Sequence, residues 1–301
     1  MKAWYLTQTA TPLVPVEIAE PVPGPGEVLL DMRAAGMCHS DVGFWDGTLD
    51  SGLDHKPIVL GHENAGVISA LGPGVTGFEF GDRVAAYPIE TEPYPGTGRD
   101  GGYAAKTLEP ASGLIRIPAQ VSFTQAAAAT DAGMTACHAI LATAKVGSGS
   151  RVGIIGLGAL GMIGAQVAVL AGAQVYGADV NAGVFTQARN VGVTECFTDV
   201  ADLQALRLDV IVDFAGMQTT ILGAVQAVQT GGRVVLVGLG AREFTIPTML
   251  FASRQIELVG SWGGTKNDIT EVLEVRRRST VRFSNPPALA RHHAGSASDL
   301  L

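Results

Sequence analysis

The sequence predicts an α/β protein of two domains, in which a small antiparallel β-barrel or sandwich precedes a doubly wound parallel sheet. The chain has 301 residues, about twice the length of a typical domain. Short apolar runs broken by Gly and Pro fill residues 1–120, whereas strand-like and helix-like patterns alternate after residue 122. A content of 47% hydrophobic and 16% charged residues excludes a disordered chain.

The first half of the chain is expected to form short antiparallel strands. Segments rich in Gly and Pro, such as 21–27 and 71–82, separate the apolar runs, and this punctuation is typical of turns between strands. The regular spacing of the runs favours a small barrel or sandwich. The runs predicted to form strands are 28–32, 58–60, 65–68, 83–87, 103–107 and 113–117.

The second half begins with an Ala-rich helical pattern over 124–145 and then alternates between strands and helices. This alternation predicts βαβ units and a parallel sheet, and six strands suffice for a doubly wound dinucleotide-binding fold. Strands are predicted at 152–156, 174–179, 195–197, 209–213, 233–238 and 256–261, with helices at 159–171, 182–190, 200–206 and 218–229.

Composition argues against several other classes of protein. The net charge of −8 is opposite in sign to that of nucleic-acid-binding domains, so no nucleic-acid partner is expected. The three cysteines, at 38, 137 and 196, are too few for a disulfide framework and fit a reducing cytoplasm. Residues 1–20 lack the apolar segment of a secretory signal. Residues 152–178 carry no charge, but their glycines are too dense for a membrane span, so no membrane partner is expected.

A Gly-rich turn between a predicted strand and a predicted helix is the clearest motif. Gly156, Gly158 and Gly161 match G-x-G-x-x-G, and Asp179 ends the next predicted strand, 23 residues after Gly156. Such glycines permit the tight turn, the close approach of a pyrophosphate and the packing of helix on strand. Asp179 would accept hydrogen bonds from a ribose and repel a 2′-phosphate, which favours NAD over NADP. A buried Gly-rich turn with an incidental Asp is the alternative.

Two segments of the first half carry candidate metal ligands. They are AAGMCHSD, residues 34–41, and LGHENAGVI, residues 60–68. The thiolate of Cys38 and the imidazole of His62 are good zinc ligands. These two residues are 24 positions apart and lie outside any C-x-x-C pair, so spacing alone leaves zinc binding and coincidence both open.

The order of these motifs resembles that of zinc-dependent alcohol dehydrogenases of the medium-chain dehydrogenase/reductase family. The pattern G-x-C-H-S-D, then G-H-E, G-D-R-V and G-L-G-A-L-G carries the resemblance, which extends over about residues 1–274. It implies a GroES-like β-barrel catalytic domain over 1–123 and a Rossmann NAD-binding domain over 124–274. It also implies a catalytic zinc in the cleft between the two domains.

The resemblance implies a set of metal-site residues. Cys38 and His62 match the first two zinc ligands, and Glu63 matches an acid beside the metal. Asp41 matches the carboxylate that orients the ligand histidine. Asp131 stands where many members have a cysteine; with Cys38 thiolate and neutral His62 it gives the same charge of −2 as a Cys₂His site. An ordinary helix N-cap is the alternative for Asp131.

Other residues acquire implied roles from the same resemblance. Ser40 matches the hydroxyl that takes the proton of the substrate alcohol, and Phe44 and Trp45 fall where the family lines its substrate pocket. The further positions implied to contact the cofactor, in addition to the Gly-rich turn and Asp179, are His39, Thr135, Leu160, Val237, Gly238 and Leu239.

Three features depart from the family pattern. Residues 87–106, where a structural zinc lobe would lie, contain no cysteine, so one catalytic zinc and no structural zinc is expected. Position 43, where a relay histidine often lies, is Gly. The segment 275–301, with five arginines and a single acid, shows no regular periodicity and is expected to be a poorly ordered basic tail. A truncated or frameshifted reading frame would explain this tail and would put activity in doubt.

The sequence therefore predicts a cytoplasmic, homo-oligomeric enzyme that transfers hydride between NAD(H) and a small alcohol, aldehyde or ketone. A polyol is one possible substrate, since polyol enzymes also use a carboxylate ligand. Two alternatives stay open: a zinc-free quinone or enone reductase of the same superfamily, and a non-catalytic NAD-binding remnant.

Overall fold

The computed structural model describes residues 1–90 and 92–278, which divide into two compact units. Unit 1 holds Met1–Asp131 and the described residues from Thr265 onward, and unit 2 holds Ala132–Gly264. The domain limits 1–123 and 124–274 come from the family resemblance of the sequence, and they stay a prediction. Helix α8 (Lys266–Arg278) includes the first four residues of the predicted tail. Residues 279–301 lie outside the described residues.

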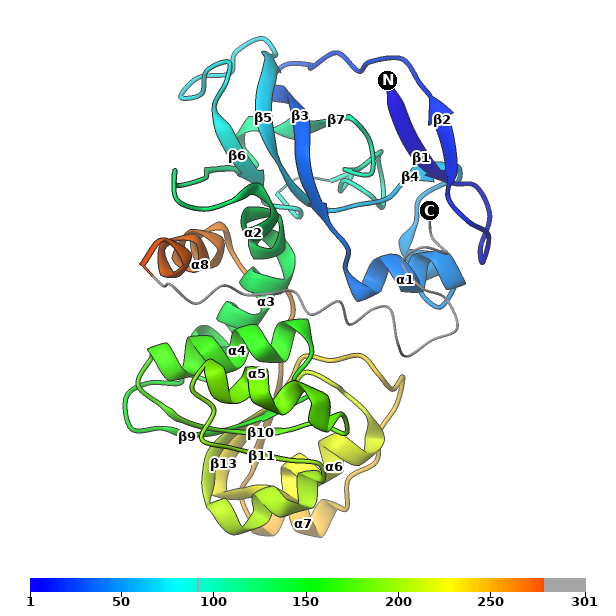
Figure 1. Ribbon diagram of the computed structural model, residues 1–301. Coiled ribbons are helices and arrows are strands. Elements are labelled where there is room, and N and C mark those ends of the chain that lie inside the picture. The colour runs from blue at the N-terminus through cyan, green and yellow to red at the C-terminus, as the bar shows by residue number, and fades with distance from the viewer. Residues whose placement is uncertain (91, 279–301) are drawn as a thin grey trace. The chain divides into compact units, whose positions relative to one another are not determined.

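Unit 1 contains two antiparallel sheets, drawn mainly in blue to green in Figure 1. The three-stranded sheet has the order β2-β1-β4 and the five-stranded sheet the order β7-β3-β5-β6-β8. The predicted antiparallel β-domain is therefore confirmed. The strands are β1 (Lys2–Leu6), β2 (Val14–Glu17), β3 (Glu27–Gly36), β4 (Ile58–Val59), β5 (Glu63–Leu71), β6 (Arg83–Ala86), β7 (Lys106–Pro110) and β8 (Leu114–Arg116).

Alternating apolar side chains form the core of the five-stranded sheet. Val28 and Leu30 of β3 face the same side and pack with Ile68 and Val84 in one buried cluster. Helix α2 (Phe123–Ala128) packs against β3 and β5. The hydroxyl of Ser122 caps this helix by accepting a hydrogen bond from the Gln125 N–H at 3.2 Å.

The edge strand β7 of this sheet carries a buried carboxyl group. Glu109 of β7 is fully buried and accepts hydrogen bonds from Asn64 Nδ2 at 2.8 Å and Arg99 Nη2 at 3.3 Å. Burial raises the pKa of Glu109 to about 7, although Arg99 and Asn64 both act to lower it. Loss of solvation therefore outweighs the ion pair at this position.

This raised pKa predicts a pH dependence of stability. Between its unfolded value of 4.5 and about 7, Glu109 keeps a proton in the folded chain that the unfolded chain has released. Stability from this group therefore falls as pH rises through that window, by roughly 3 kcal/mol for a shift of this size. We expect Glu109→Gln to weaken the pH dependence of the free energy of unfolding, measured in urea, between about pH 5 and 7.

The control Glu20→Gln changes an exposed carboxylate paired with Lys106, and its free energy of unfolding should depend on pH as in wild type. Equal slopes in wild type and Glu109→Gln would contradict the assignment.

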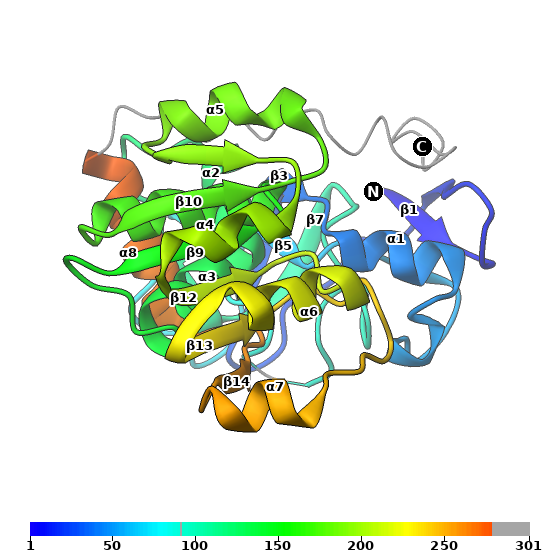
Figure 2. The same cartoon turned by 90° about the horizontal axis from the view of Figure 1, so that it is seen from below.

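Unit 2 contains one six-stranded parallel sheet with the order β11-β10-β9-β12-β13-β14, which Figure 2 shows strand by strand. Each neighbouring pair of strands in this sheet is parallel, so the predicted doubly wound sheet is confirmed. The strands are β9 (Arg151–Ile155), β10 (Gln174–Ala178), β11 (Glu195–Phe197), β12 (Leu208–Asp213), β13 (Val228–Leu236) and β14 (Glu257–Gly260).

Helices cover both faces of this sheet, with α4 and α5 on one face and α6 and α7 on the other (Figure 1). On the second face, Leu203, Leu208 and Val225 belong to a buried cluster that also contains side chains of β9, β10 and β13. The helices are α3 (Met134–Cys137), α4 (Ala159–Leu170), α5 (Phe185–Asn190), α6 (Gln218–Ala227) and α7 (Thr248–Ser253).

The uncharged stretch 152–178 does not form one helix. It is divided among β9, the 12 residues of α4 and β10. Within residues 1–90 and 92–278, none of the helices has both the length and the apolar character needed to span a bilayer.

Candidate metal and dinucleotide sites

Three side chains from distant segments of unit 1 meet at one point. The ligating atoms of Cys38, His62 and Asp131 all lie within 4.8 Å of one another. A thiol sulfur, an imidazole nitrogen and a carboxylate oxygen are the donor types that zinc prefers, and three protein ligands leave a fourth position open. The donor set present in this structure therefore fits a catalytic-type zinc site.

The pairing of two strands brings the first two of these residues together. In the antiparallel register of β3 with β5, Gly36 pairs with Glu63. Cys38 follows β3 by two residues and His62 immediately precedes β5, so both emerge at the same end of this strand pair. Cys38 also begins helix α1 (His39–Asp46) as its N-cap residue.

Asp131 comes from a helical stretch that packs on the same strands. It lies in the π-helical segment Ala129–Gly133, which continues α2 without a break into α3. The residue therefore lies inside a helical run, and the alternative of an N-cap at a helix start is wrong for it. Widened π turns often occur at functional sites.

The two nitrogens of the His62 ring face different partners. Nε2 lies 3.5 Å from Asp131 Oδ2, and Nδ1 lies 3.5 Å from Asp41 Oδ1. Nδ1 and Asp41 Oδ1 are buried, and neither has a hydrogen-bond partner in the described part of the chain. Nε2 is thus turned toward Asp131 and Nδ1 toward Asp41, an orientation that would suit a carboxylate–histidine–metal arrangement.

Acidic groups dominate the electrostatics around this ring. Burial raises the pKa of the Cys38 thiol, and Asp131 and Glu63 add to that effect, while the hydrogen bond with His62 opposes it. Burial acts to lower the pKa of His62, but Asp41, Asp131 and Cys38 together carry it well above its usual value. The site thus concentrates negative charge at a position where a divalent cation would fit.

Glycine at position 36 makes room for a second buried acid, Glu63. Glu63 is 4% exposed, and a Cβ atom at Gly36 would lie 1.7 Å from Glu63 Oε2. Any larger residue at this position would displace the carboxylate. Asp41 is 2% exposed and accepts hydrogen bonds from Cys38 N and from the hydroxyl of Tyr103, both at 2.9 Å.

Helix α1 carries the other candidate residues of unit 1. Ser40 is half-buried and His39 is exposed. Phe44 belongs to a buried apolar cluster against which Trp45 packs, and the Trp45 indole donates to Thr11 O at 2.7 Å. The place of these two rings in a substrate pocket stays a prediction.

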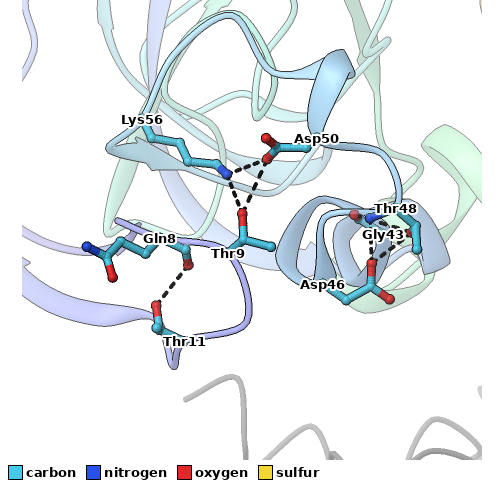
Figure 3. Close-up of polar contacts among 8 residues, drawn as sticks. All are labelled: Gln8, Thr9, Thr11, Gly43, Asp46, Thr48, Asp50 and Lys56. Atoms are coloured by element: carbon cyan, nitrogen blue, oxygen red, sulfur yellow. Dashed lines mark hydrogen bonds and ion pairs between the residues drawn. The ribbon is translucent and has the colours of Figure 1, made fainter.

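Polar contacts hold the loops next to α1, as Figure 3 shows. Lys56 Nζ bonds to Asp50 and, at 2.7 Å, to Thr9 Oγ1, which ties the segment after β1 to the loop before β4. Thr48 donates to Asp46 Oδ1 from its backbone N–H at 2.8 Å and from its hydroxyl at 2.7 Å. These contacts fix both ends of the loop that follows the helix.

The Gly-rich turn of unit 2 has the backbone that its motif predicts. Gly156 adopts a φ of +81°, and a Cβ atom at Gly161 would lie 1.8 Å from Gly156 O. Gly158 is the N-cap residue of α4, and nothing lies within 4 Å of the position of its absent Cβ. Asp179 Oδ2 accepts from Leu157 N at 2.7 Å, so this acid is tied directly to the turn.

Sequence reasoning missed a buried acid at the end of β12. Asp213 is 0% exposed and accepts from the backbone N–H groups of Ala215 and Gly216, both at 2.9 Å, and from Thr220 Oγ1 at 2.7 Å. Burial raises its pKa, and these hydrogen bonds oppose the rise. Its carbonyl oxygen accepts from the N–H groups of Val237 and Gly238, both at 3.0 Å. The sequence pattern that could have identified Asp213 is an acid at the carboxyl end of a buried strand.

The remaining predicted cofactor residues lie in unit 2. Thr135 is buried in α3, whereas Leu239 is 64% exposed after β13. Leu160 is half-buried in the first turn of α4. Contact of these residues with a cofactor stays a prediction.

Two family models match the chain in the order that the sequence motifs suggest. The Alcohol dehydrogenase GroES-like domain matches residues 24–119, and the Zinc-binding dehydrogenase matches residues 159–277. The sorbitol dehydrogenase of Gallus gallus is 32% identical over 273 residues, covering 80% of this chain and 76% of the relative. The chain belongs to the zinc-type alcohol dehydrogenases of the medium-chain dehydrogenase/reductase family. An alcohol dehydrogenase of Geobacillus stearothermophilus is 31% identical, covering 94% of this chain and 90% of that relative.

Solved structures with this dehydrogenase fold are similar to the chain over most of its length. Acetophenone reductase from Geotrichum candidum, in complex with NAD, has a TM-score of 0.84 and 31% identity, covering 92% of this chain and 86% of the other. The alcohol dehydrogenase of Aeropyrum pernix has a TM-score of 0.85 and 28% identity, covering 92% and 90%. The predicted family, its GroES-like and Rossmann folds, and the class of alcohol and carbonyl oxidoreductases are therefore confirmed.

The Gly-rich turn of this dehydrogenase allows packing and cofactor approach to be tested separately. We expect Gly161→Ala to lower the free energy of unfolding by roughly 1–3 kcal/mol, because the new Cβ would overlap a backbone oxygen. Gly158→Ala should fold within about 0.5 kcal/mol of wild type, since the space around it is open, yet weaken NADH binding by crowding the pyrophosphate. Thermal unfolding and NADH fluorescence titration measure the two effects. Unchanged NADH affinity in Gly158→Ala would remove this turn from the cofactor site.

Proposed function

We propose that this chain is an NAD(H)-dependent oxidoreductase that interconverts a small alcohol and its carbonyl compound at one zinc held by Cys38, His62 and Asp131. The meeting of these three ligating atoms within 4.8 Å carries the proposal. Relatives named sorbitol dehydrogenase, alcohol dehydrogenase and acetophenone reductase support the substrate class. The absence of cysteine from 87–106 supports a single zinc without a structural one.

The residues of unit 1 would prepare the site for this chemistry. When bound, zinc would supply a Lewis acid at the substrate oxygen and NAD a hydride acceptor. Asp41 would keep the His62 ring in its ligating orientation, and the buried Glu63 would add negative charge beside the ligands. Ser40, in the first turn of α1, would accept the proton of the alcohol. Because position 43 is Gly, that proton would leave through water or a cofactor hydroxyl.

The residues of unit 2 would hold the dinucleotide. The turn from Gly156 to Gly161, with Leu160, would receive the pyrophosphate at the N-terminus of α4. Asp179 would accept hydrogen bonds from the adenosine ribose, and its charge would exclude a 2′-phosphate, so NAD is favoured over NADP. The other positions proposed to contact the cofactor are His39, Thr135, Val237, Gly238 and Leu239.

A second copy of the chain is the proposed macromolecular partner. Strand β14 pairs with β13 on one side and, within residues 1–90 and 92–278, ends the order of the six-stranded sheet, so its other edge would be available to a strand of another copy. We propose a cytoplasmic location, which is supported by the lack of a disulfide bond at Cys38, Cys137 and Cys196.

The zinc content of Asp131 variants tests the proposed function. We expect purified wild type to contain about one zinc per chain and to reduce NAD in the presence of alcohols. Asp131→Ala should lose most of the zinc and at least about 100-fold in kcat/KM while staying folded, because one of three ligands is gone. Asp131→Cys should retain zinc, since it restores a thiolate with the same charge.

Atomic absorption and NADH absorbance measure these two quantities. Asp202→Ala, which removes an exposed acid of unit 2, is the control and should match wild type. Zinc-free wild type with reductase activity would favour the zinc-free quinone or enone reductase. A zinc-loaded chain that binds NADH without turnover would favour the non-catalytic remnant.

A further inference from the structure

The hydroxyl of Tyr103 links the candidate metal site to a segment that the sequence motifs leave out. Tyr103 precedes β7, and its hydroxyl oxygen lies 2.9 Å from Asp41 Oδ2 and 3.2 Å from Gly36 O. A hydroxyl has one proton to donate, and a charged carboxylate is a stronger acceptor than a carbonyl. The hydrogen bond therefore goes chiefly to Asp41.

The Asp41 carboxylate connects both ligand-bearing segments to this tyrosine. Its Oδ2 accepts from Tyr103 and from the backbone N–H of Cys38, both at 2.9 Å. Its Oδ1 faces Nδ1 of His62 at 3.5 Å. Two donors on one oxygen fix the plane of the carboxylate, and this plane sets the direction in which the second oxygen meets the imidazole.

Tyr103 also packs against the backbone next to His62. Its N–H donates to Leu60 O at 2.9 Å. Gly61, with a φ of +100°, lies against the tyrosine ring so closely that a Cβ atom there would be 2.7 Å from Cδ1. The ring thus supports the backbone of the loop, while the hydroxyl acts on the carboxylate, so the two effects can be separated by removing the hydroxyl alone.

We propose that Tyr103 is a positioning residue of the metal site. Through Asp41, its hydroxyl holds the His62 imidazole and the start of α1 at Cys38 in the orientation that a metal requires. This inference rests on the proposed function, because it needs a metal at Cys38, His62 and Asp131. Removing an outer partner of a metal-ligating histidine typically weakens metal affinity by about 10–100-fold.

The test compares the metal affinity of two tyrosine variants. Tyr103→Phe keeps the ring and removes the hydroxyl, and we expect its Kd for Zn²⁺, measured by competition with a chromophoric chelator, to rise by about tenfold or more. The visible spectrum of the Co²⁺-substituted variant should also shift, because the ligand geometry changes. Tyr5→Phe, which removes a hydroxyl from β1 of the same unit, should keep the wild-type Kd and spectrum.

A double-mutant cycle identifies the route of the effect. In an Asp41→Ala background, removing the Tyr103 hydroxyl should cause no further loss of affinity, because its acceptor is absent. A full additional loss would show that the hydroxyl acts on the fold and not through the carboxylate, and would overturn the inference. Unchanged Kd and spectrum in Tyr103→Phe, with wild type binding one metal, would overturn this inference and leave the proposed function standing. Absence of metal binding by wild type would overturn both.

Discussion

The gathering of acidic groups around one imidazole is the constraint on which the candidate site depends. Cys38, Asp41 and Asp131 all act on the His62 ring, and burial works against the charged forms of His62 and Cys38. A protonated imidazole offsets one unit of negative charge. A divalent cation would offset two units and would bond the three ligating atoms at once, which supports the proposal that this site holds a metal.

The backbone of unit 1 is arranged to meet this constraint. The pairing of β3 with β5 sets Cys38 and His62 at one end of the sheet, and α2, packed on the same strands, continues into the π-helical turn of Asp131. Small residues then allow close approach: Gly36 accommodates the Glu63 carboxylate and Gly61 accommodates the Tyr103 ring. The site therefore depends on sheet register as much as on the ligand residues themselves.

Local patterns predicted the features that depend on neighbouring residues. The strands of the parallel sheet appear as apolar runs, and β9 to β12 start and end within about one residue of the predicted limits. The limits of β13 differ more from the predicted strand 233–238, since β13 begins at Val228 and ends at Leu236. The segments 182–190 and 200–206 are helical, but the second is a 3₁₀ segment and the first begins with one.

Some local elements and the contacts between distant residues escaped prediction. Strand β2 contains Pro15 and helix α1 contains Gly43, and these residue types are uncommon inside strands and helices. Asp131 was assigned as a ligand only because the chain resembles a family, since no local spacing connects it with Cys38. Tyr103 lies 62 positions from Asp41, so the bond between them is visible only once the fold brings them together.

X-ray absorption at the zinc edge of the purified, zinc-loaded protein tests the central claim most directly. One sulfur at about 2.3 Å, with the remaining ligands nitrogen or oxygen at about 2.0–2.2 Å, is the predicted coordination for Cys38, His62 and Asp131. Two or more sulfurs in the first coordination shell, or none, would contradict it.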